Sequence, residues 1–253
     1  MSNTKTRPDP RLRLFCEGDL GPDRAVVITS GQNHHLHTVL RARAGQQVLL
    51  FNGRDGEWLA SIRATESRRT TLLTDHQTRP QAGLPDIWLV FSPLTRDRTH
   101  YAVEKATELG VARICPVTMT RTRPRRIVPE RLRAVAIGAA QQCGGLAVPE
   151  ISHPQPLDSL LTHWPAGRTL FHCDETLTDR PCDPYALAHA GPRAVLIGPE
   201  GGLDPGERAM LHDCDFTHPV SLGPRILRAE TALVCALTLM NVLPSAAGVG
   251  TPA

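Results

Sequence analysis

From residue 87 onward the chain alternates short apolar segments with segments of helical periodicity. The apolar segments have the length of buried strands, and they lie at residues 87–91, 112–117, 168–173, 194–198 and 219–222. Helices are expected at residues 98–109, 129–142, 183–190 and 225–243, and another begins after Asp204. This alternation predicts an α/β fold whose parallel sheet is covered by helices on both faces.

The N-terminal part has a different pattern. Between residues 11 and 77, short strand-like segments are separated by Gly, Asn and Asp turns, and one helix is expected near residues 32–41. This spacing favours a small β-barrel. Residues 78–85 contain two prolines and a glycine, so they are the best candidate linker. We therefore expect a β-barrel domain over residues 11–77 and an α/β domain over residues 84–244.

Positive charge is concentrated in the first part of the chain. Residues 1–133 hold 22 Lys and Arg against 13 Asp and Glu, whereas the remaining residues hold 6 against 12. Nearly all of this charge is arginine, because Lys5 and Lys105 are the only lysines. Arginine binds phosphate through two parallel hydrogen bonds, so this half indicates a nucleic-acid partner. The alternative is that a GC-rich genome favours arginine codons.

Several classes of protein are disfavoured. The seven cysteines are scattered without a C-x-x-C pair, and the histidines His34, His35 and His37 fit no usual zinc spacing. We therefore expect no metal and no disulfide framework. The N-terminal segment is polar, and the apolar run at 231–243 is too short to span a bilayer. A cytoplasmic protein with reduced thiols is the expectation.

The first motif with chemical content is LIGPEGG at residues 196–202. A predicted strand ends there in a glycine-rich loop, and Asp204, Pro205 and Glu207 then have the N-cap, N1 and N3 spacing of a helix start. Ligands of open α/β sheets bind beyond the carboxyl ends of the strands. The spacing matches neither a dinucleotide fingerprint nor a P-loop. The alternative is an ordinary tight turn between a strand and a helix.

A second loop, SLGPRILRAETA at residues 221–232, also joins a strand to a helix through a Gly-Pro turn. Two such loops on neighbouring strands would form the walls of one pocket. The less specific interpretation is that Arg228 and Glu230 form only an ion pair at a helix start. A third motif is the basic run over residues 121–133, which lacks aromatic residues and suits phosphate contacts better than base stacking.

Three segments in a fixed order resemble a known family. KATELGV (105–111), IGPEGG (197–202) and LGPRILRAETA (222–232) are similar to the motifs of the RsmE family of 16S ribosomal RNA (uracil-N3) methyltransferases. RLF (13–15) and HHLHTVLR (34–41) match the opening pattern of that family. The resemblance covers residues 11–243.

The resemblance implies a C-terminal SPOUT domain with a trefoil knot and a PUA-like N-terminal barrel that binds RNA. It also implies S-adenosylmethionine as cofactor, a homodimer with its site near the subunit boundary, and a uridine of the small-subunit 16S rRNA as substrate. The implied cofactor residues are His172, Ile197, Gly198, Pro199, Glu200, Gly201, Gly202, Leu222, Gly223, Ile226, Leu227 and Thr231.

The expected catalytic groups follow from the chemistry of N3. This nitrogen is a poor nucleophile until its proton leaves, so cationic side chains near the uracil oxygens would favour the reactive anion. Arg225 and Arg228 are the candidates for that role, and Glu200 or Glu230 is the candidate base. RNA contacts are expected from Arg11, Arg13, Arg41, Arg96, Arg98, Arg121, Arg123, Arg125 and Arg126.

The chain departs from the family pattern at three places. Gly138-Ala139-Ala140-Gln141-Gln142 stands where the family has an E-A-A-E-Q type stretch, Ala229 where threonine is frequent, and Thr120-Arg121-Thr122 where an acidic-Arg-Ser stretch is usual. Two alternatives stay open: ribose 2′-O methylation of RNA, and an RNA-binding relative that has lost catalysis. A nicotinamide enzyme is disfavoured by the glycine spacing.

Overall fold

The computed structural model describes residues 12–34, 36, 38, 41–66, 69–123, 126–187 and 191–242 of the 253-residue chain. These residues form two compact units. The N-terminal unit holds the described residues up to Gly83 together with Ala140–Val148, and the C-terminal unit holds the remainder. The prediction had assigned residues 140–148 to the second domain.

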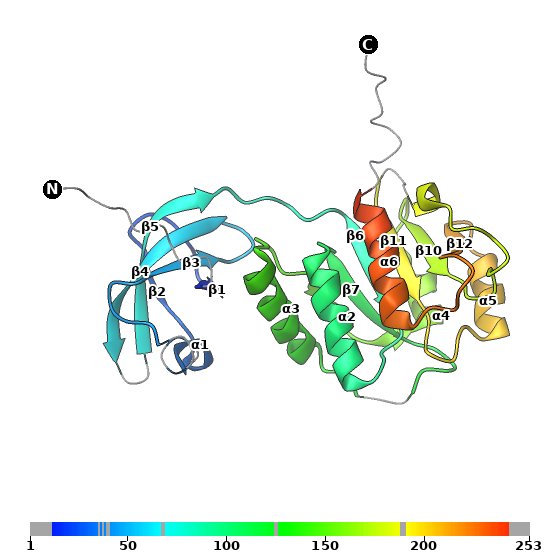
Figure 1. Cartoon of the computed structure of the whole chain (residues 1–253), viewed down its shortest axis with the longest axis horizontal. Coiled ribbons are helices and arrows are strands. Elements are labelled where there is room, and N and C mark those ends of the chain that lie inside the picture. The colour runs from blue at the N-terminus through cyan, green and yellow to red at the C-terminus, as the bar shows by residue number, and fades with distance from the viewer. Residues whose placement is uncertain are drawn as a thin grey trace, which may run out of the picture. The chain divides into compact units, whose positions relative to one another are not determined.

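The N-terminal unit is built on a five-stranded sheet (Figure 1). Its order is β1 (Arg13–Phe15), β3 (Gln47–Phe51), β4 (Glu57–Glu66), β5 (Arg69–Arg79) and β2 (Ala25–Val27). β1 pairs parallel with β3, and the other pairs are antiparallel. β5 continues to Arg79, so the predicted linker at residues 78–85 begins inside this strand. β1 and β2 are the two edge strands, and they do not pair with each other among the described residues. Strand pairing between these two edges therefore does not close the predicted barrel.

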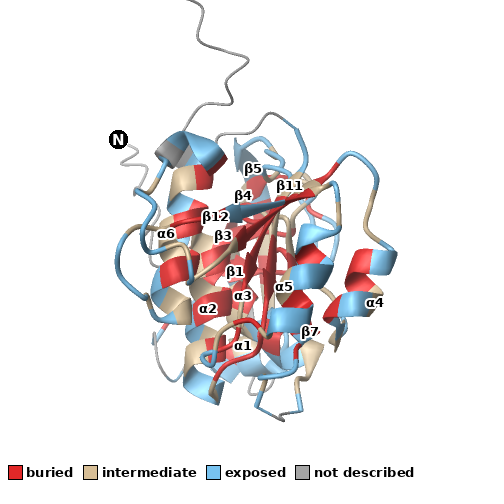
Figure 2. Cartoon of the chain, turned by 90° about the vertical axis from the view of Figure 1, so that its right-hand side faces the viewer, coloured by how far each residue is buried: buried red, intermediate tan, exposed pale blue. Residues whose placement is uncertain are grey.

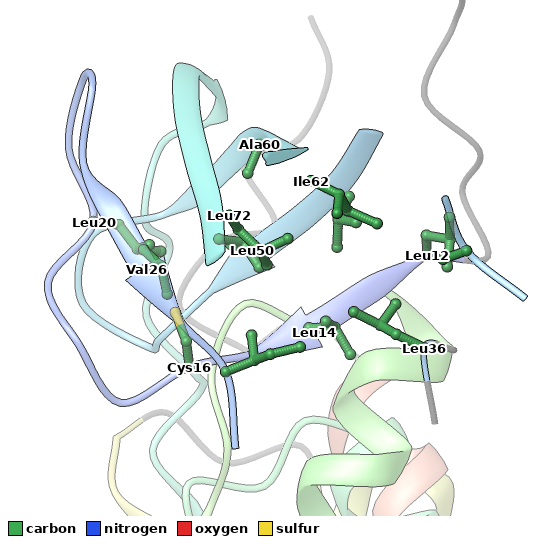
Figure 3. Close-up of a cluster of buried hydrophobic side chains, with 13 residues drawn as sticks. Leu12, Leu14, Cys16, Leu20, Val26, Leu36, Leu50, Ala60, Ile62 and Leu72 are labelled. Carbon is green, nitrogen blue, oxygen red and sulfur yellow. The ribbon is translucent and has the colours of Figure 1, made fainter. Parts of the chain in front are cut away.

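The core of the N-terminal unit is a cluster of aliphatic side chains that the strands contribute in alternation (Figure 3). Leu14, Leu50 and Leu72 are 3% exposed or less, and Leu36 joins the same cluster. The turn before β4 is fixed by Asn52, whose Oδ1 accepts from the backbone N–H groups of Arg54 and Asp55. This is the Asn turn that the sequence favours. The predicted helix begins at Ser30 as α1 (Ser30–His34), and several of its later positions lie outside the described residues.

Arg13 explains why residues 140–148 pack in the N-terminal unit. Its Nη1 donates to the carbonyls of Ala140 and Gln141 at 2.9 and 3.0 Å, and its Nη2 donates to the carbonyl of Gly145 at 3.0 Å. A cation at these carbonyls caps the end of helix α3 (Pro129–Cys143). Arg13 is only 8% exposed. The predicted RNA contact for Arg13 is therefore corrected, because its donors serve internal packing.

The C-terminal unit contains the predicted parallel sheet. Every pair in it is parallel, as the alternation of strands and helices predicted. The strand order is β12 (Thr217–Val220), β10 (Thr169–Cys173), β11 (Arg193–Ile197), β6 (Ile87–Phe91), β7 (Arg113–Thr118) and β8 (Glu150–Ile151), and β9 (Gln155–Pro156) also pairs with β7. The two shortest strands, β8 and β9, carry too few residues for a periodic signal.

Helices cover both faces of this sheet, so its central strands β6, β7, β10 and β11 are mostly buried and apolar. Figure 2 shows the buried strands between α2 (Arg96–Glu108) and α6 (Ala229–Val242) on one side and α4 (Leu157–Thr162) and α5 (Pro205–His212) on the other. The predicted helix over 183–190 is a short 3-10 turn, Pro184–Leu187, with residues 188–190 outside the described residues. The predicted last helix begins four residues late, so residues 225–228 form a loop. None of the described helices is long and apolar enough to cross a membrane.

Candidate functional site

A cavity of about 410 Å³ opens at the carboxyl ends of β10, β11 and β12. The loops that leave these three strands form its walls, and Arg98 of α2 completes the lining. This is the edge where parallel sheets bind ligands, because several loops converge there. All of these elements belong to the C-terminal unit.

Both glycine loops line this one cavity, as the sequence predicted. The first contributes Ile197, Gly198, Pro199, Glu200 and Gly202, and the second contributes Leu222, Gly223, Arg225, Ile226, Leu227 and Arg228. The strands that carry the two loops are not neighbours, however, because β10 lies between β11 and β12. The loop that follows β10 therefore becomes the third wall.

The first loop needs glycine for a steric reason. Gly202 has a φ of +74°, and a Cβ at this position would overlap the carboxylate of Glu175. The helix that follows begins as predicted, since Asp204 Oδ1 accepts from Gly206 N–H and Glu207 Oε2 accepts from the backbone N–H of Asp204. This capping box fixes where the loop ends and α5 begins.

The second loop turns at Gly223, whose φ is +103°. Arg225 and Arg228 follow it at the cavity, and both side chains are exposed. Neither makes a hydrogen bond or ion pair with another described residue. Their guanidinium groups are therefore available to a ligand, as their predicted role requires.

The two predicted carboxylates are ion-paired. Glu200 lines the cavity and contacts Arg98 Nη1, and Arg123 Nη2 lies 3.9 Å from its other oxygen. Glu230 is outside the lining, and its Oε1 lies 3.6 Å from Arg98 Nε. Arg98, predicted to bind RNA, is thus a cavity residue that joins both carboxylates.

The resemblance implied a third wall from the strand-end residues near His172, but the residues that form it were not identified. They are Cys173, the last residue of β10, and Asp174, Glu175 and Thr178 after it. Burial alone would raise the pKa of Asp174, but hydrogen bonds from Thr176 and Arg208 outweigh burial and lower the pKa below its ordinary value. Position could have identified these residues, since they follow a predicted strand at the same edge. Val220, Ala229 and Ala232 complete the missed lining.

Three predicted cofactor residues do not line the cavity. His172 is 4% exposed within β10, and burial lowers its pKa to about 4. Its Nδ1 has no hydrogen-bond partner among the described residues. Thr231 is an exposed residue of α6, and Gly201 directs its carbonyl to Arg121 Nη1 at 2.8 Å. The prediction for β10 was therefore one position too early.

The predicted RNA-binding arginines fall into several groups. Arg41, Arg96 and Arg126 are exposed, as an RNA contact requires. Arg121 and Arg123 are exposed as well but lie against the first glycine loop. Arg11 and Arg125 lie outside the described residues. Within the described part of the chain no group of three or more His, Cys, Asp or Glu side chains could hold a metal ion.

Comparison with known proteins gives consistent results over both units. A family model described as an RNA methyltransferase domain matches residues 82–241, and an RNA methyltransferase PUA domain model matches residues 28–71. The chain is 30% identical to the ribosomal RNA small subunit methyltransferase E of Mycobacterium tuberculosis, over 92% of each protein. It is 26% identical to the protein of that name from Rickettsia conorii, over 92% of this chain and 96% of the relative.

Solved structures match over the same length. The ribosomal RNA small subunit methyltransferase E of Neisseria gonorrhoeae, bound to S-adenosyl methionine, has a TM-score of 0.80 and 28% identity, covering 92% of this chain and 98% of that one. A putative methyltransferase of Legionella pneumophila, in complex with the same cofactor, has a TM-score of 0.78 and 28% identity, covering 93% and 97%.

Proposed function

The chain belongs to the RNA methyltransferase family, within the group of the ribosomal RNA small subunit methyltransferases E, and from this we propose that it methylates N3 of one uridine in 16S rRNA. The methyl donor is S-adenosylmethionine, and the enzyme is a transferase. The observation that carries this proposal is that both glycine loops line one cavity. The basic residues of the first half supply the attraction to RNA.

The residues of the cavity fit the donor. Its volume of about 410 Å³ is in the range of small-molecule sites. Leu222, Leu227 and Val220 offer apolar surface, and Gly198 and Gly223 let the backbone approach a ligand closely. When bound, S-adenosylmethionine supplies an electrophilic methyl group on a positively charged sulfur. The loops hold that group in line with the target nitrogen, and this positioning supplies much of the rate.

The side chains at the cavity mouth prepare the nucleophile. N3 of uracil reacts once its proton has left, and the resulting anion spreads its charge onto O2 and O4. Arg225 and Arg228 carry exposed guanidinium groups that favour this anion electrostatically. We assign proton acceptance to Glu200 before Glu230, because only Glu200 lines the cavity. Arg98 contacts the carboxylate of Glu200, so this contact must loosen when Glu200 takes up the proton.

Finer features extend the proposal. We propose that the loops around β10 form the trefoil knot of SPOUT domains and that two copies form a homodimer near the cavity. In such a dimer the partner subunit would cover Ile226, a cavity residue that keeps 77% of its surface exposed. A ribosomal RNA substrate supports the proposal of a cytoplasmic enzyme, and we propose no metal because methyl transfer from a sulfonium does not itself require one.

The altered stretch at 138–142 does not weaken the proposal. None of these residues lines the cavity. Gln141 instead accepts a hydrogen bond from Phe15 N–H through Oε1, and its carbonyl accepts from Arg13. The change at Gln141 therefore lies in internal packing of the N-terminal unit, and Gly138 is an exposed position of the C-terminal unit away from the cavity. The alternative of a catalytically inactive RNA-binding relative has less support for that reason.

The test is methylation of small ribosomal subunits from a strain that lacks the modification, with labelled S-adenosylmethionine. Nuclease digestion and mass spectrometry then locate the methyl group. We expect 3-methyluridine at one position, and none added to subunits that already carry the modification. Label on a ribose would favour 2′-O methylation, and RNA binding without label would favour an inactive relative.

A further inference from the structure

We propose that Glu175 is a positioning residue for the methyl donor, because its carboxylate holds the loop of residues 198–203 in the conformation that binds S-adenosylmethionine. This inference rests on the proposed function. It concerns a residue in the third wall of the cavity, which the motifs of the sequence did not identify. Glu175 acts through the loop and has no part in the chemical step.

The first contact is between Glu175 and the backbone of the loop. Glu175 Oε1 accepts a hydrogen bond from Leu203 N–H at 3.2 Å. Leu203 is 1% exposed, so water cannot replace this acceptor. The carboxylate also occupies the space that a side chain at Gly202 would need. The glycine and the carboxylate therefore fix each other's position.

Arg208 of α5 orients the carboxylate. Its Nη2 contacts Glu175 Oε1, and its Nη1 donates to the carbonyl of Leu203 at 3.1 Å. Its Nε donates to both oxygens of Asp174 at 3.2 and 3.3 Å. One guanidinium thus binds two carboxylates of the third wall and the end of the loop. This closed set of contacts ties the loop after β11 to the loop after β10.

The opposite side of the loop is held separately. Arg121 Nη1 donates to the carbonyl of Gly201, and its aliphatic part packs 3.4 Å from where a Cβ of Gly201 would lie. Arg121 does not line the cavity, whereas Glu175 does. Glu175 is therefore the anchor that bears on the shape of the binding site. Without this anchor the loop would be less ordered in the free protein. Ordering it would then cost part of the free energy of donor binding.

The contacts predict a specific defect. Without Glu175 the donor has to order the loop when it binds, so its dissociation constant rises. Once the donor is bound the loop is in place, so the turnover number at saturating donor changes little. A direct attraction between the carboxylate and the sulfonium would behave differently. It would weaken S-adenosylmethionine but leave S-adenosylhomocysteine, whose sulfur is neutral, unaffected.

The test is calorimetric titration of the full chain and of the Glu175→Ala and Glu175→Gln variants with both compounds. We expect the dissociation constants of both compounds to rise about tenfold in Glu175→Ala, the order expected for the loss of one hydrogen bond to a charged group. Glu175→Gln should lose less, because it keeps an acceptor for Leu203 N–H. Glu130→Gln is the control, since Glu130 is an exposed residue of α3 outside the cavity.

The outcomes separate the two proposals. If the unchanged protein binds no S-adenosylmethionine, the proposed function fails. If it binds and Glu175→Ala binds equally well, the positioning role alone is overturned. That role is also overturned if only S-adenosylmethionine is weakened, or if turnover falls at unchanged affinity. Should Glu175→Ala fail to fold, Glu175→Gln decides, through the rise in melting temperature that each compound produces.

Discussion

Arg13 and Glu57 form a buried ion pair in the N-terminal unit, with Arg13 Nε donating to Glu57 Oε2 at 2.9 Å. The remaining donors of Arg13 bind the carbonyls of Ala140, Gln141 and Gly145. Every nitrogen of this guanidinium is therefore committed inside the unit. An arginine in an Arg-rich segment is not by itself a nucleic-acid contact, and burial separates the two roles.

The first prediction concerns this ion pair. Arg13→Met leaves Glu57 buried with the half-exposed Arg79, 3.7 Å away, as its one cationic partner among the described residues, beside the hydrogen bond that Thr78 Oγ1 donates to Glu57 Oε1. We expect the free energy of unfolding to fall by about 3 kcal/mol, the lower end for breaking a buried pair. Denaturant titration measures this free energy. The control is Arg43→Met at an exposed position, whose free energy of unfolding should stay within about 0.5 kcal/mol of that of the unchanged protein. A stable Arg13→Met variant with weaker RNA binding would restore the predicted RNA contact.

The second prediction concerns Arg228. Replacement by alanine removes an exposed cation at the cavity mouth, and we expect turnover to fall by a factor of about 100 to 1,000. The affinity for S-adenosylmethionine should change far less, because the loops supply most of the contacts. Single-turnover kinetics and calorimetry measure the two quantities. Equal losses in both would contradict the assigned role.

The third prediction concerns salt. Arg96 and Arg126 are exposed, and we expect RNA affinity to fall steeply as salt is raised. Replacing either arginine by alanine should weaken binding and reduce the salt slope by about one. Filter binding at several salt concentrations gives the slope. An affinity that is insensitive to salt would rule out phosphate contacts as the main attraction.

The fourth prediction concerns pH and His172. Burial lowers its pKa to about 4 from an ordinary value of 6.5, with the nearby Arg208, His218 and His212 adding to the effect and Asp174 opposing it. The folded protein thus binds this proton less readily than the unfolded chain. The stability that results is complete above pH 6.5 and is lost as pH falls toward 4. The loss should be roughly 2–3 kcal/mol.

Denaturant titrations at several pH values test this for the protein and for His172→Gln. The variant cannot take up the proton, so its stability should fall less over the same window. Carboxylates contribute equally to both proteins, and the difference between the two curves isolates the histidine. Parallel curves would show that His172 has no such effect.

The sequence was sufficient for the layers of the C-terminal unit but not for the order of its strands. Apolar runs of strand length, separated by helical periodicity, predict a covered parallel sheet wherever they occur. The position of β10 between β11 and β12 comes from how the chain threads, and no local pattern encodes it. The assignment of residues 140–148 to the N-terminal unit likewise depends on contacts of Arg13 with a distant segment.

The candidate site was predictable where glycine was required. Gly202 and Gly223 adopt positive φ angles that strongly favour this residue, so their loops stand out in the sequence. Glu175 and Arg208 escape such reasoning, because an acidic and a basic residue on separate elements look like ordinary surface charges. Only the fold brings them together at Leu203.

The central claim is that the two glycine loops jointly bind the methyl donor. Calorimetric titration of S-adenosylmethionine into Gly202→Ala and Gly223→Ala tests it directly, with Gly167→Ala as control. Gly167 has a similar φ of +78° but lies outside the cavity, with open space around it, so the control carries the same backbone strain. We expect both loop variants to lose at least about tenfold in affinity, or 1.4 kcal/mol, and the control to match the unchanged protein. If either loop variant binds the donor as tightly as the unchanged protein, the claim is wrong.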